Sequence, residues 1–504
     1  MNTNHIFAID RIASSFVKHN RKKLKKKYII LYQAIKDCIH KVELPHLWII
    51  PSTRILANEL NLSRTTVVKA YELLSLEKLI LPKRGSGYSV NLPPKIILDS
   101  NQNKNLLDDN SLYPELSEKG IAFLSNLTIL NRESNKGIAF RPGLPPLDIF
   151  PVNQWKNLLN TYWRYVKSSG LSDSPSSGIE VLKKNICNYL NISRNIKCEP
   201  DQLIIVSGSL QSLYLISSVL INKGDSIILE NPTFPNVHSI FKSSLANLIP
   251  ISLDNEGISL EEINKSNNLK PKLVHVTPSN HYPLGIKMSL KRKKELITWA
   301  SENKALIIEN DYENEVSSHQ GINPSIYSLD NEDRTIYLGT FNRLLHPTIR
   351  LGYMIVPKYL IKTIEALQEH SHKFVAPSIQ MVMSQFIEKN YLYQHLKNIN
   401  TVAQEREALF ISLFNENTTK MSIEKKTYSS LHLVAKFNQE IDIKKESEII
   451  QSLSKINIVV HSLSGCYIGN ERNQGLIFGY SSVRPTIIRQ KVIQMTDILN
   501  ECLV

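Results

Sequence analysis

Two hydrophobic patterns divide the chain. Between residues 28 and 92, apolar positions recur with helical spacing in three short segments, 28–42, 52–60 and 64–78. From about residue 136, short apolar runs typical of buried strands alternate with helix-like segments; the runs are 203–207, 226–230, 272–278, 305–310 and 335–340. Strands separated by helices predict an α/β domain with a mostly parallel, doubly wound sheet. The pattern predicts a multidomain chain, in which a small helical unit precedes a large α/β domain.

Four segments follow from this pattern. Residues 1–27 form a basic N-terminal extension, residues 28–92 the small unit, residues 93–135 a linker, and residues 136–504 the large domain. The linker is rich in Asn, Asp, Ser and Pro, and it is long for a loop inside one domain. A length of 504 residues also favours several domains.

Charge is concentrated at the N-terminal end. The net charge is +14, and residues 1–90 contribute +10 of it, with 16 Lys+Arg against 6 Asp+Glu. Such asymmetry indicates a polyanion as partner. A solvated basic tail is the alternative, because residues 21–27 hold six of these charges. The helical patterning of the next 65 residues favours the polyanion partner.

Other classes of protein are disfavoured by composition. The chain has no run of about 18 apolar residues, which predicts no membrane span. Its N-terminus lacks the apolar core of a secretory signal. The five cysteines are odd in number and form no C-x-x-C pair, which predicts free thiols in a reducing cytoplasm and no metal site.

The small unit has the pattern of a winged helix-turn-helix. Its first helix places Ile29, Tyr32, Ile35 and Ile39 on one face. Ser63 directly precedes the third helical segment, 64–78, and is placed to cap this helix by accepting a hydrogen bond from a free backbone N–H. That helix is expected to bury one face and to leave a polar, basic N-terminal turn exposed; the buried positions are Val67, Ala70, Tyr71 and Leu74.

This arrangement is what insertion into the DNA major groove requires. Arg64 can read a guanine edge in bidentate fashion, and Thr65 and Thr66 suit phosphate. Residues 79–90 read as two short strands around a Lys-Arg-Gly-Ser-Gly turn, which predicts a wing that meets the DNA backbone or minor groove. The alternative is a three-helix packing module whose basic residues are incidental.

The same residues resemble the GntR-type winged helix. The matching elements are Pro51-Ser52-Thr53-Arg54, Leu62-Ser63-Arg64-Thr65-Thr66-Val67, Ala70-Tyr71 and Arg84-Gly85-Ser86-Gly87. The resemblance implies double-stranded DNA as partner. With the pattern above, it predicts these DNA contacts: Arg54, Ser63, Arg64, Thr65, Thr66, Lys69, Lys83, Arg84 and Gly85.

Residues 136–504 resemble the fold-type I aminotransferases, and specifically the effector domain of MocR-type regulators. Ordered short motifs carry the resemblance: Phe140-Arg141-Pro142-Gly143, Ser207-Gly208-Ser209-Leu210-Gln211, Glu230-Asn231-Pro232, Tyr282-Pro283-Leu284-Gly285, Glu309-Asn310-Asp311-Tyr312 and the run from Tyr337 to Tyr353. The resemblance implies an α/β fold, a homodimer and a pyridoxal phosphate pocket. The positions that it assigns to the pocket are Ser209, Leu210, Phe234, Asn310, Tyr312, Thr340, Arg343 and Arg350.

Two of these positions depart from the family pattern. Arg343 stands where the family has the Schiff-base lysine, and a guanidinium cannot form that imine. No lysine lies between Lys304 and Lys358, which excludes a small slip in alignment. Asn310 stands where a carboxylate would face the pyridine nitrogen, and Asp311 is expected to point elsewhere because neighbours alternate along a strand.

The sequence therefore predicts a cytoplasmic, homodimeric transcriptional regulator and not an enzyme, with no catalytic residues. Pyridoxal phosphate binds non-covalently or not at all. Arg343 beside Arg350 suits a phosphorylated or dicarboxylate effector; alternatively, Arg343 fills the cofactor space by pairing with a carboxylate. Two rival functions remain: a pyridoxal phosphate-dependent aminotransferase carrying a DNA-binding domain, and a DNA-binding scaffold without ligand.

Overall fold

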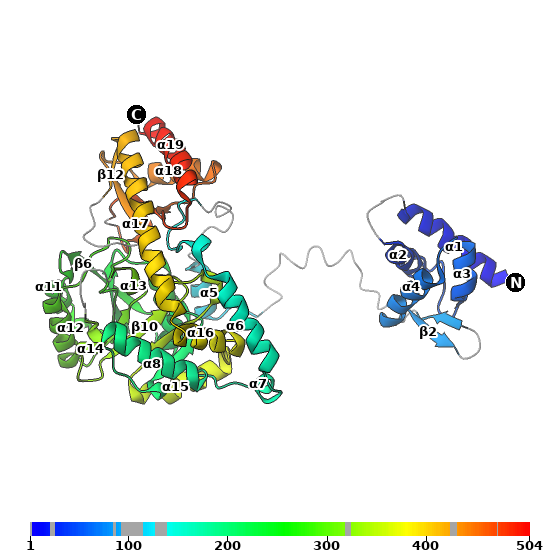
Figure 1. Cartoon of the computed structure of the whole chain (residues 1–504), viewed down its shortest axis with the longest axis horizontal. Coiled ribbons are helices and arrows are strands. Elements are labelled where there is room, and N and C mark those ends of the chain that lie inside the picture. The colour runs from blue at the N-terminus through cyan, green and yellow to red at the C-terminus, as the bar shows by residue number, and fades with distance from the viewer. Residues whose placement is uncertain are drawn as a thin grey trace. The chain divides into compact units, whose positions relative to one another are not determined.

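A computed structural model shows two compact units, residues 1–115 and residues 116–504, which we describe separately (Figure 1). The structure describes residues 3–20, 26–83, 87–91, 114–126, 139–317, 324–423, 431–470 and 472–503. Within these ranges, no helix is both long enough and apolar enough to cross a membrane.

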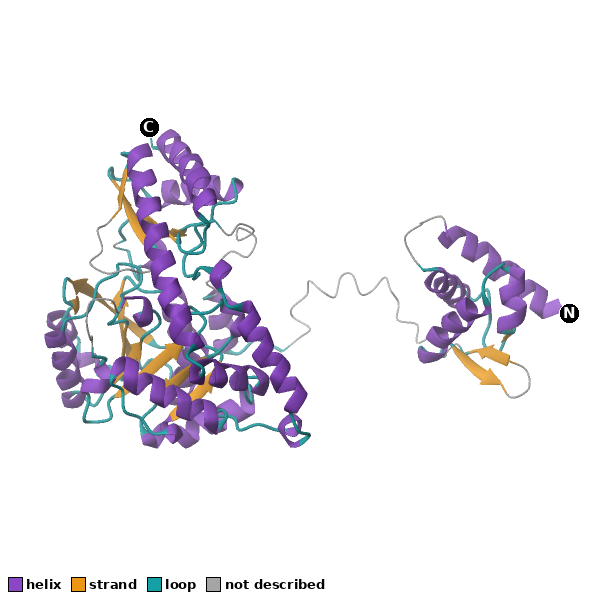
Figure 2. Ribbon diagram, in the orientation of Figure 1, coloured by secondary structure: helices purple, strands orange, loops and turns teal. Residues whose placement is uncertain are grey.

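The first unit is a winged helix, as predicted (Figure 2). Its helices are α2 (Lys27–His40), α3 (Thr53–Glu59) and α4 (Arg64–Leu76). Strands β1 (Ile49–Ile50), β2 (Ile80–Lys83) and β3 (Gly87–Val90) form an antiparallel sheet in the order β1-β3-β2. The predicted core residues Val67, Ala70, Tyr71 and Leu74 are all buried on α4.

A further helix, α1 (Thr3–Asn20), lies within the segment that the sequence marked only as a basic extension. It packs against α2 and adds Ala8, Ile9, Ile12 and Phe16 to the buried core. Because α1 covers a second side of α2, the buried stripe of α2 is wider than predicted and includes Ile30, Leu31, Ala34 and Cys38. Of the four residues that the sequence placed on one face of this helix, Ile35 and Ile39 are buried and Ile29 and Tyr32 are half-buried.

The second unit is built on an eight-stranded sheet in the order β4-β11-β10-β9-β8-β5-β6-β7. Pairing is parallel from β10 through β9, β8 and β5 to β6, and antiparallel at β11 and β7. All five predicted strands are present. The strands are β4 (Leu203–Val206), β5 (Ser226–Asn231), β6 (Asn247–Asp254), β7 (Gly257–Ile258), β8 (Leu273–Val276), β9 (Leu306–Asn310), β10 (Thr335–Thr340) and β11 (Gly352–Ile355).

Helices cover both faces of this sheet, which explains why its central strands are apolar on both sides. On one face lie α9 (Ser209–Leu220), α10 (Pro235–Ser243) and α15 (Lys358–Ser371). The helices that pack elsewhere on the unit are α6 (Val152–Tyr165), α7 (Ser169–Ser172), α8 (Glu180–Arg194), α11 (Leu260–Lys265), α12 (Leu290–Glu302), α13 (Asn314–Ser317), α14 (Ile326–Leu329) and α16 (Pro377–Glu388).

A second, smaller sheet near the C-terminus was not predicted. Strands β12 (Met421–Ile423), β13 (Leu433–Phe437), β14 (His461–Ser462) and β15 (Gly475–Phe478) pair antiparallel in the order β12-β13-β15-β14. The long helix α17 (Tyr391–Asn417) packs on α19 (Pro485–Cys502), and α18 (Ile443–Lys455) contacts both α19 and β14.

The predicted linker contains a helix, α5 (Glu118–Ser125), which packs against α10 of the second unit. The Ser243 hydroxyl donates to the Ala122 carbonyl (3.4 Å), and the Ser239 hydroxyl donates to the carbonyl of Asn126. Lys223 pairs with Glu118 at the other end of α5 (2.5 Å). Part of the segment 93–135 is therefore anchored to the large unit, and residues 92–113 and 127–138 lie outside the described residues.

Candidate functional site

The N-terminal turn of α4 presents polar side chains to solvent. Ser63 caps this helix as predicted: its Oγ accepts from the Thr66 N–H (3.2 Å) and lies 2.9 and 2.7 Å from the hydroxyls of Thr65 and Thr66. Arg64 and Thr65 are exposed, whereas Thr66 is half-buried. The cap therefore holds the first turn in place while Arg64 stays free to reach a base edge.

The other predicted DNA contacts surround this turn. Arg54 is exposed on α3, next to the Ser52 side chain that caps α3 through the Ile55 N–H (3.3 Å). Lys69 is exposed on α4, one turn after Thr65, and Lys83 is exposed at the end of β2. Arg84 and Gly85 lie outside the described residues, so their predicted contacts stay predictions.

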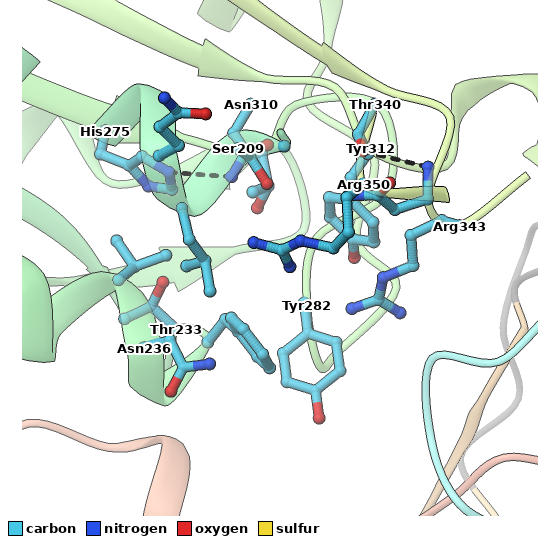
Figure 3. A pocket seen from close by; sticks show the side chains of 17 residues that line it. Ser209, Thr233, Asn236, His275, Tyr282, Asn310, Tyr312, Thr340, Arg343 and Arg350 are labelled. Carbon is cyan, nitrogen blue, oxygen red and sulfur yellow. Dashed lines mark hydrogen bonds between the residues drawn. The ribbon is translucent and has the colours of Figure 1, made fainter. Parts of the chain in front are cut away.

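A cavity of about 180 Å³ opens at the carboxyl ends of the parallel strands in the large sheet, which is where open α/β sheets bind ligands. It receives side chains from the loops after β4, β5, β8, β9 and β10 (Figure 3). All eight pocket positions that the sequence singled out line it: Ser209, Leu210, Phe234, Asn310, Tyr312, Thr340, Arg343 and Arg350.

One end of this pocket is suited to an anion. Helix α9 begins there with Ser209 and has no side-chain cap, so its first N–H groups are available to a ligand. Arg350 lies at the same end, with Nη2 3.5 Å from the Ser207 hydroxyl. Asn342 braces this end, because its amide donates to the Ser207 carbonyl (2.9 Å) and accepts from the Leu351 N–H (2.9 Å).

Asn310 and Asp311 point to different surroundings, as the alternation along β9 predicted. The Asn310 amide lines the pocket and donates to His275 Nε2 (3.3 Å). The Asp311 carboxylate instead accepts from the Tyr337 hydroxyl (2.7 Å) and pairs with Arg194, and it is fully buried. Asp311 does not replace the missing carboxylate in the pocket.

Arg343 is paired with a buried carboxylate. Its Nη1 lies 3.1 Å from Oε1 of Glu313, a side chain with no exposed surface. The guanidinium also lies over the Tyr312 ring, 5.0 Å from its centroid. Gly143, with φ of +81°, makes room for it, because a β-carbon at that position would collide with the guanidinium. Of the two roles that the sequence left open for Arg343, the geometry matches pairing with a carboxylate.

Burial sets the charge states of the remaining polar groups. It lowers the pKa of His275 to about 4, so that imidazole is neutral near pH 7. It raises the pKa of Glu230 to about 8, although Thr277 donates to this carboxyl through its N–H (3.0 Å) and hydroxyl (2.7 Å). Of these two groups, His275 lines the pocket, and it adds no charge to the wall beside Asn310.

The family models match both units. The model described as "Aminotransferase class I and II" matches residues 156–475, and the model of gntR-family bacterial regulatory proteins matches residues 27–90. The chain belongs to the aminotransferase class I and II family. Ahead of this aminotransferase-like unit it carries a GntR-type winged helix.

Two transcriptional regulators and a solved aminotransferase structure are similar to this chain. The chain is 28% identical over 448 residues to the probable rhizopine catabolism regulatory protein MocR of Rhizobium meliloti, covering 88% of this chain and 87% of that protein. It is 24% identical over 455 residues to the pyridoxine biosynthesis transcriptional regulator PdxR of Corynebacterium glutamicum, covering 89% and 90%. The crystal structure of a Pyrococcus horikoshii kynurenine aminotransferase superposes with a TM-score of 0.67 at 22% identity, covering 80% of this chain and 98% of that one.

The pocket fits only part of pyridoxal phosphate. The first turn of α9, Thr340 and Arg350 suit its phosphate. The aldehyde end of pyridoxal phosphate has no matching group, because the residues that line the pocket in the described part of the chain include no lysine. Asn310 also cannot balance the charge of a protonated ring nitrogen.

Sequence reasoning missed the partners of the two altered positions. His275 lies on β8 and lines the pocket, and Glu313 directly follows Tyr312 in the chain. Neither residue was singled out from the sequence. Glu313 is three residues after Asn310, so an acidic residue close to the altered site was the available signal. Gly143 was noted only as part of a motif, and its role in admitting Arg343 needs the folded structure.

Proposed function

We propose that this protein is a DNA-binding transcriptional regulator whose aminotransferase-like unit is not catalytic. The observation that carries the proposal is the ion pair between Arg343 and Glu313 in the pocket where an aminotransferase needs a free amine. Arginine stays protonated at every relevant pH, so it cannot supply that amine. The names of the relatives MocR and PdxR support the same role.

DNA binding is assigned to the winged helix. Exposed Arg64 at the start of a capped helix, with Arg54, Lys69 and Lys83 around it, supplies both base-reading and phosphate-binding groups. The match of residues 27–90 to gntR-family regulators supports the same assignment. The predicted contacts of Arg84 and Gly85 belong to this proposal through the wing motif alone.

The pocket is proposed to bind an effector non-covalently. Helix α10 connects the pocket with α5. Residues of its first turn, Asn236 and Val237, line the pocket. Further along the same helix, Ser239 and Ser243 hold α5, which belongs to the segment that leads to the winged helix. An effector that favours one position of α10 would therefore act on the anchored end of this segment.

A homodimer is part of the proposal. Helix α6 exposes large apolar side chains, including Val152 (61%), Trp163 (57%) and Tyr165 (70%), and such a surface favours burial against a partner. Two copies would carry two recognition helices, as palindromic half-sites require. Light scattering after size-exclusion chromatography is expected to give twice the mass of the 57.5 kDa chain; a monomer would remove this part of the proposal.

The test of the whole proposal uses two measurements on one purified sample. A gel shift with the DNA upstream of the protein's own gene is expected to show a discrete complex. Addition of pyridoxal 5′-phosphate is expected to give no stoichiometric visible band that borohydride abolishes. A borohydride-sensitive band mapped to one buried lysine would favour the rival aminotransferase, and loss of the DNA complex would reject the regulator.

A further inference from the structure

Of the two arginines that line the pocket, one has its positive charge already balanced by a carboxylate of the protein. Glu313, the partner of Arg343, also accepts from the Asn280 amide (3.1 Å) and the Leu431 N–H (3.4 Å). Withdrawing Arg343 towards a ligand would leave this fully buried carboxylate without its counter-charge, which is strongly unfavourable. Arg343 and Glu313 therefore add no net charge to the pocket.

Arg350 supplies the remaining charge. Among the pocket-lining residues of the described chain, it is the only cation that is not paired with a carboxylate. Its hydrogen bond to the Ser207 hydroxyl is long, at 3.5 Å, and its side chain is exposed. The uncapped first turn of α9, at Ser209, lies at the same end of the pocket (Figure 3). One cation and one helix N-terminus at one end match a single anionic group.

The rest of the pocket is uncharged and partly aromatic. His275 is neutral because burial lowers its pKa, and Asn310 donates to it. The Asn310 oxygen is buried and has no hydrogen-bond partner among the described residues. The rings of Phe234 and Tyr282 meet edge-to-face with centroids 5.2 Å apart and line the same cavity. These surroundings suit a flat, uncharged group that carries polar edges.

We propose that the pocket selects a phosphate monoester of an uncharged planar ring and rejects dicarboxylates. This inference rests on the proposed effector role of the same pocket. It also implies that an aldehyde on the ring is irrelevant to affinity, since the residues lining the described pocket include no lysine. The ring nitrogen of a bound pyridine would be protonated less readily than in a site with a carboxylate, because the Asn310 amide carries no negative charge.

Calorimetry on the full-length protein at pH 8 tests the selection with three probes: pyridoxal 5′-phosphate, pyridoxine 5′-phosphate and glutarate. The two esters are expected to bind with affinities within about threefold of each other, and glutarate not to bind measurably. Replacing Arg350 with glutamine is expected to lower ester affinity by about tenfold or more, because a charge-assisted contact is lost. Binding of glutarate by the wild-type protein would overturn the inference. Binding of pyridoxal 5′-phosphate without binding of pyridoxine 5′-phosphate would overturn it as well.

A gain-of-binding variant makes the test sharper. Glu313→Gln keeps the shape of the side chain and frees Arg343, so glutarate binding is expected to appear while ester binding persists. Glu256→Gln is the control, because this exposed acid pairs with Arg292 outside the pocket and its loss should leave all three affinities unchanged. A folded Glu313→Gln protein that still ignores glutarate would contradict the proposal.

A second variant covers the case in which Glu313→Gln does not fold. Bound pyridoxine 5′-phosphate is expected to absorb as the form with an unprotonated ring nitrogen in the wild type, and as the protonated form in Asn310→Asp. Identical spectra would overturn the inference. If neither ester binds, the inference fails, and a gel shift on the same sample decides separately whether the proposed DNA-binding function survives.

Discussion

The guanidinium of Arg194 donates to the carboxylate of Asp311 where neither group meets solvent, with side-chain exposures of 3% and 0%. Removing one member of such a pair leaves an uncompensated buried charge. Asp311→Ala is therefore expected to lower the free energy of unfolding of the large unit by about 3–5 kcal/mol, measured by urea denaturation.

A matched pair elsewhere in the unit provides the control. Asp254 lies 2.8 Å from Arg292 and is itself 50% exposed, and Arg292 keeps Glu256 and Glu295 as partners when Asp254 is removed. Asp254→Ala is expected to cost about 1 kcal/mol or less. Equal losses for the two variants would show that burial does not decide the strength of these pairs.

His275 predicts a pH dependence of stability with a definite sign. The unfolded chain takes up a proton on this residue near pH 6.5, while burial holds the pKa in the folded state at about 4. Protons therefore favour the unfolded state between these values, and stability falls as the pH drops from about 6.5 towards 4. His275→Gln keeps an acceptor for Asn310 but cannot titrate.

The comparison of wild type and His275→Gln isolates this group, because other buried histidines titrate in both proteins. The stability advantage of the wild type is expected to shrink by about 1–3 kcal/mol between pH 7 and pH 4.5. Urea denaturation at the two pH values measures it. Parallel pH profiles for the two proteins would contradict the assignment of a neutral, buried imidazole.

Gly143→Ala tests the space that Arg343 occupies. A β-carbon there collides with the guanidinium, and φ of +81° is unfavourable for alanine. The expected cost is about 2–4 kcal/mol, combining overpacking with backbone strain. The control is Gly170→Ala on α7, where a β-carbon would make only an ordinary contact of 3.4 Å with Val166. Thermal unfolding of both variants measures the difference; equal midpoints would count against the packing of Arg343.

Arg64→Ala is expected to abolish the site-specific DNA complex while leaving the fold intact, because the side chain is exposed. A bidentate base contact is worth about 1–3 kcal/mol, which corresponds to roughly five- to 150-fold in affinity. Footprinting measures it, with Glu72→Gln as the control on the same helix, also exposed. An unchanged footprint would mean that α4 is not the recognition helix.

Much of the fold was readable from local patterns. The five apolar runs became strands β4, β5, β8, β9 and β10 because strands covered on both faces need continuous apolar side chains. Ser63 as a helix cap and the buried face of α4 follow from spacing within one helix. The small C-terminal sheet was missed because its strands have only two to five residues and no long apolar run marks them.

The pocket shows where sequence reasoning stops. Its eight predicted lining residues could be placed because the resemblance to fold-type I aminotransferases assigns each of these positions to the pocket. The pairing of Arg343 with Glu313 could not, since it joins loops 30 residues apart whose approach depends on the sheet. The packing of α1 and α5 was missed for a similar reason: each helix is held by contacts with a separate element.

The setting of Arg343 also determines what a lysine at this position would meet. A change of this one codon to lysine would place an ammonium beside the Glu313 carboxylate, which would keep the amine protonated and unreactive. Asn310 would still offer the ring an amide. Under the proposed function, a lysine at position 343 alone would therefore not supply the charge balance of an aminotransferase site, because Glu313 and Asn310 would remain.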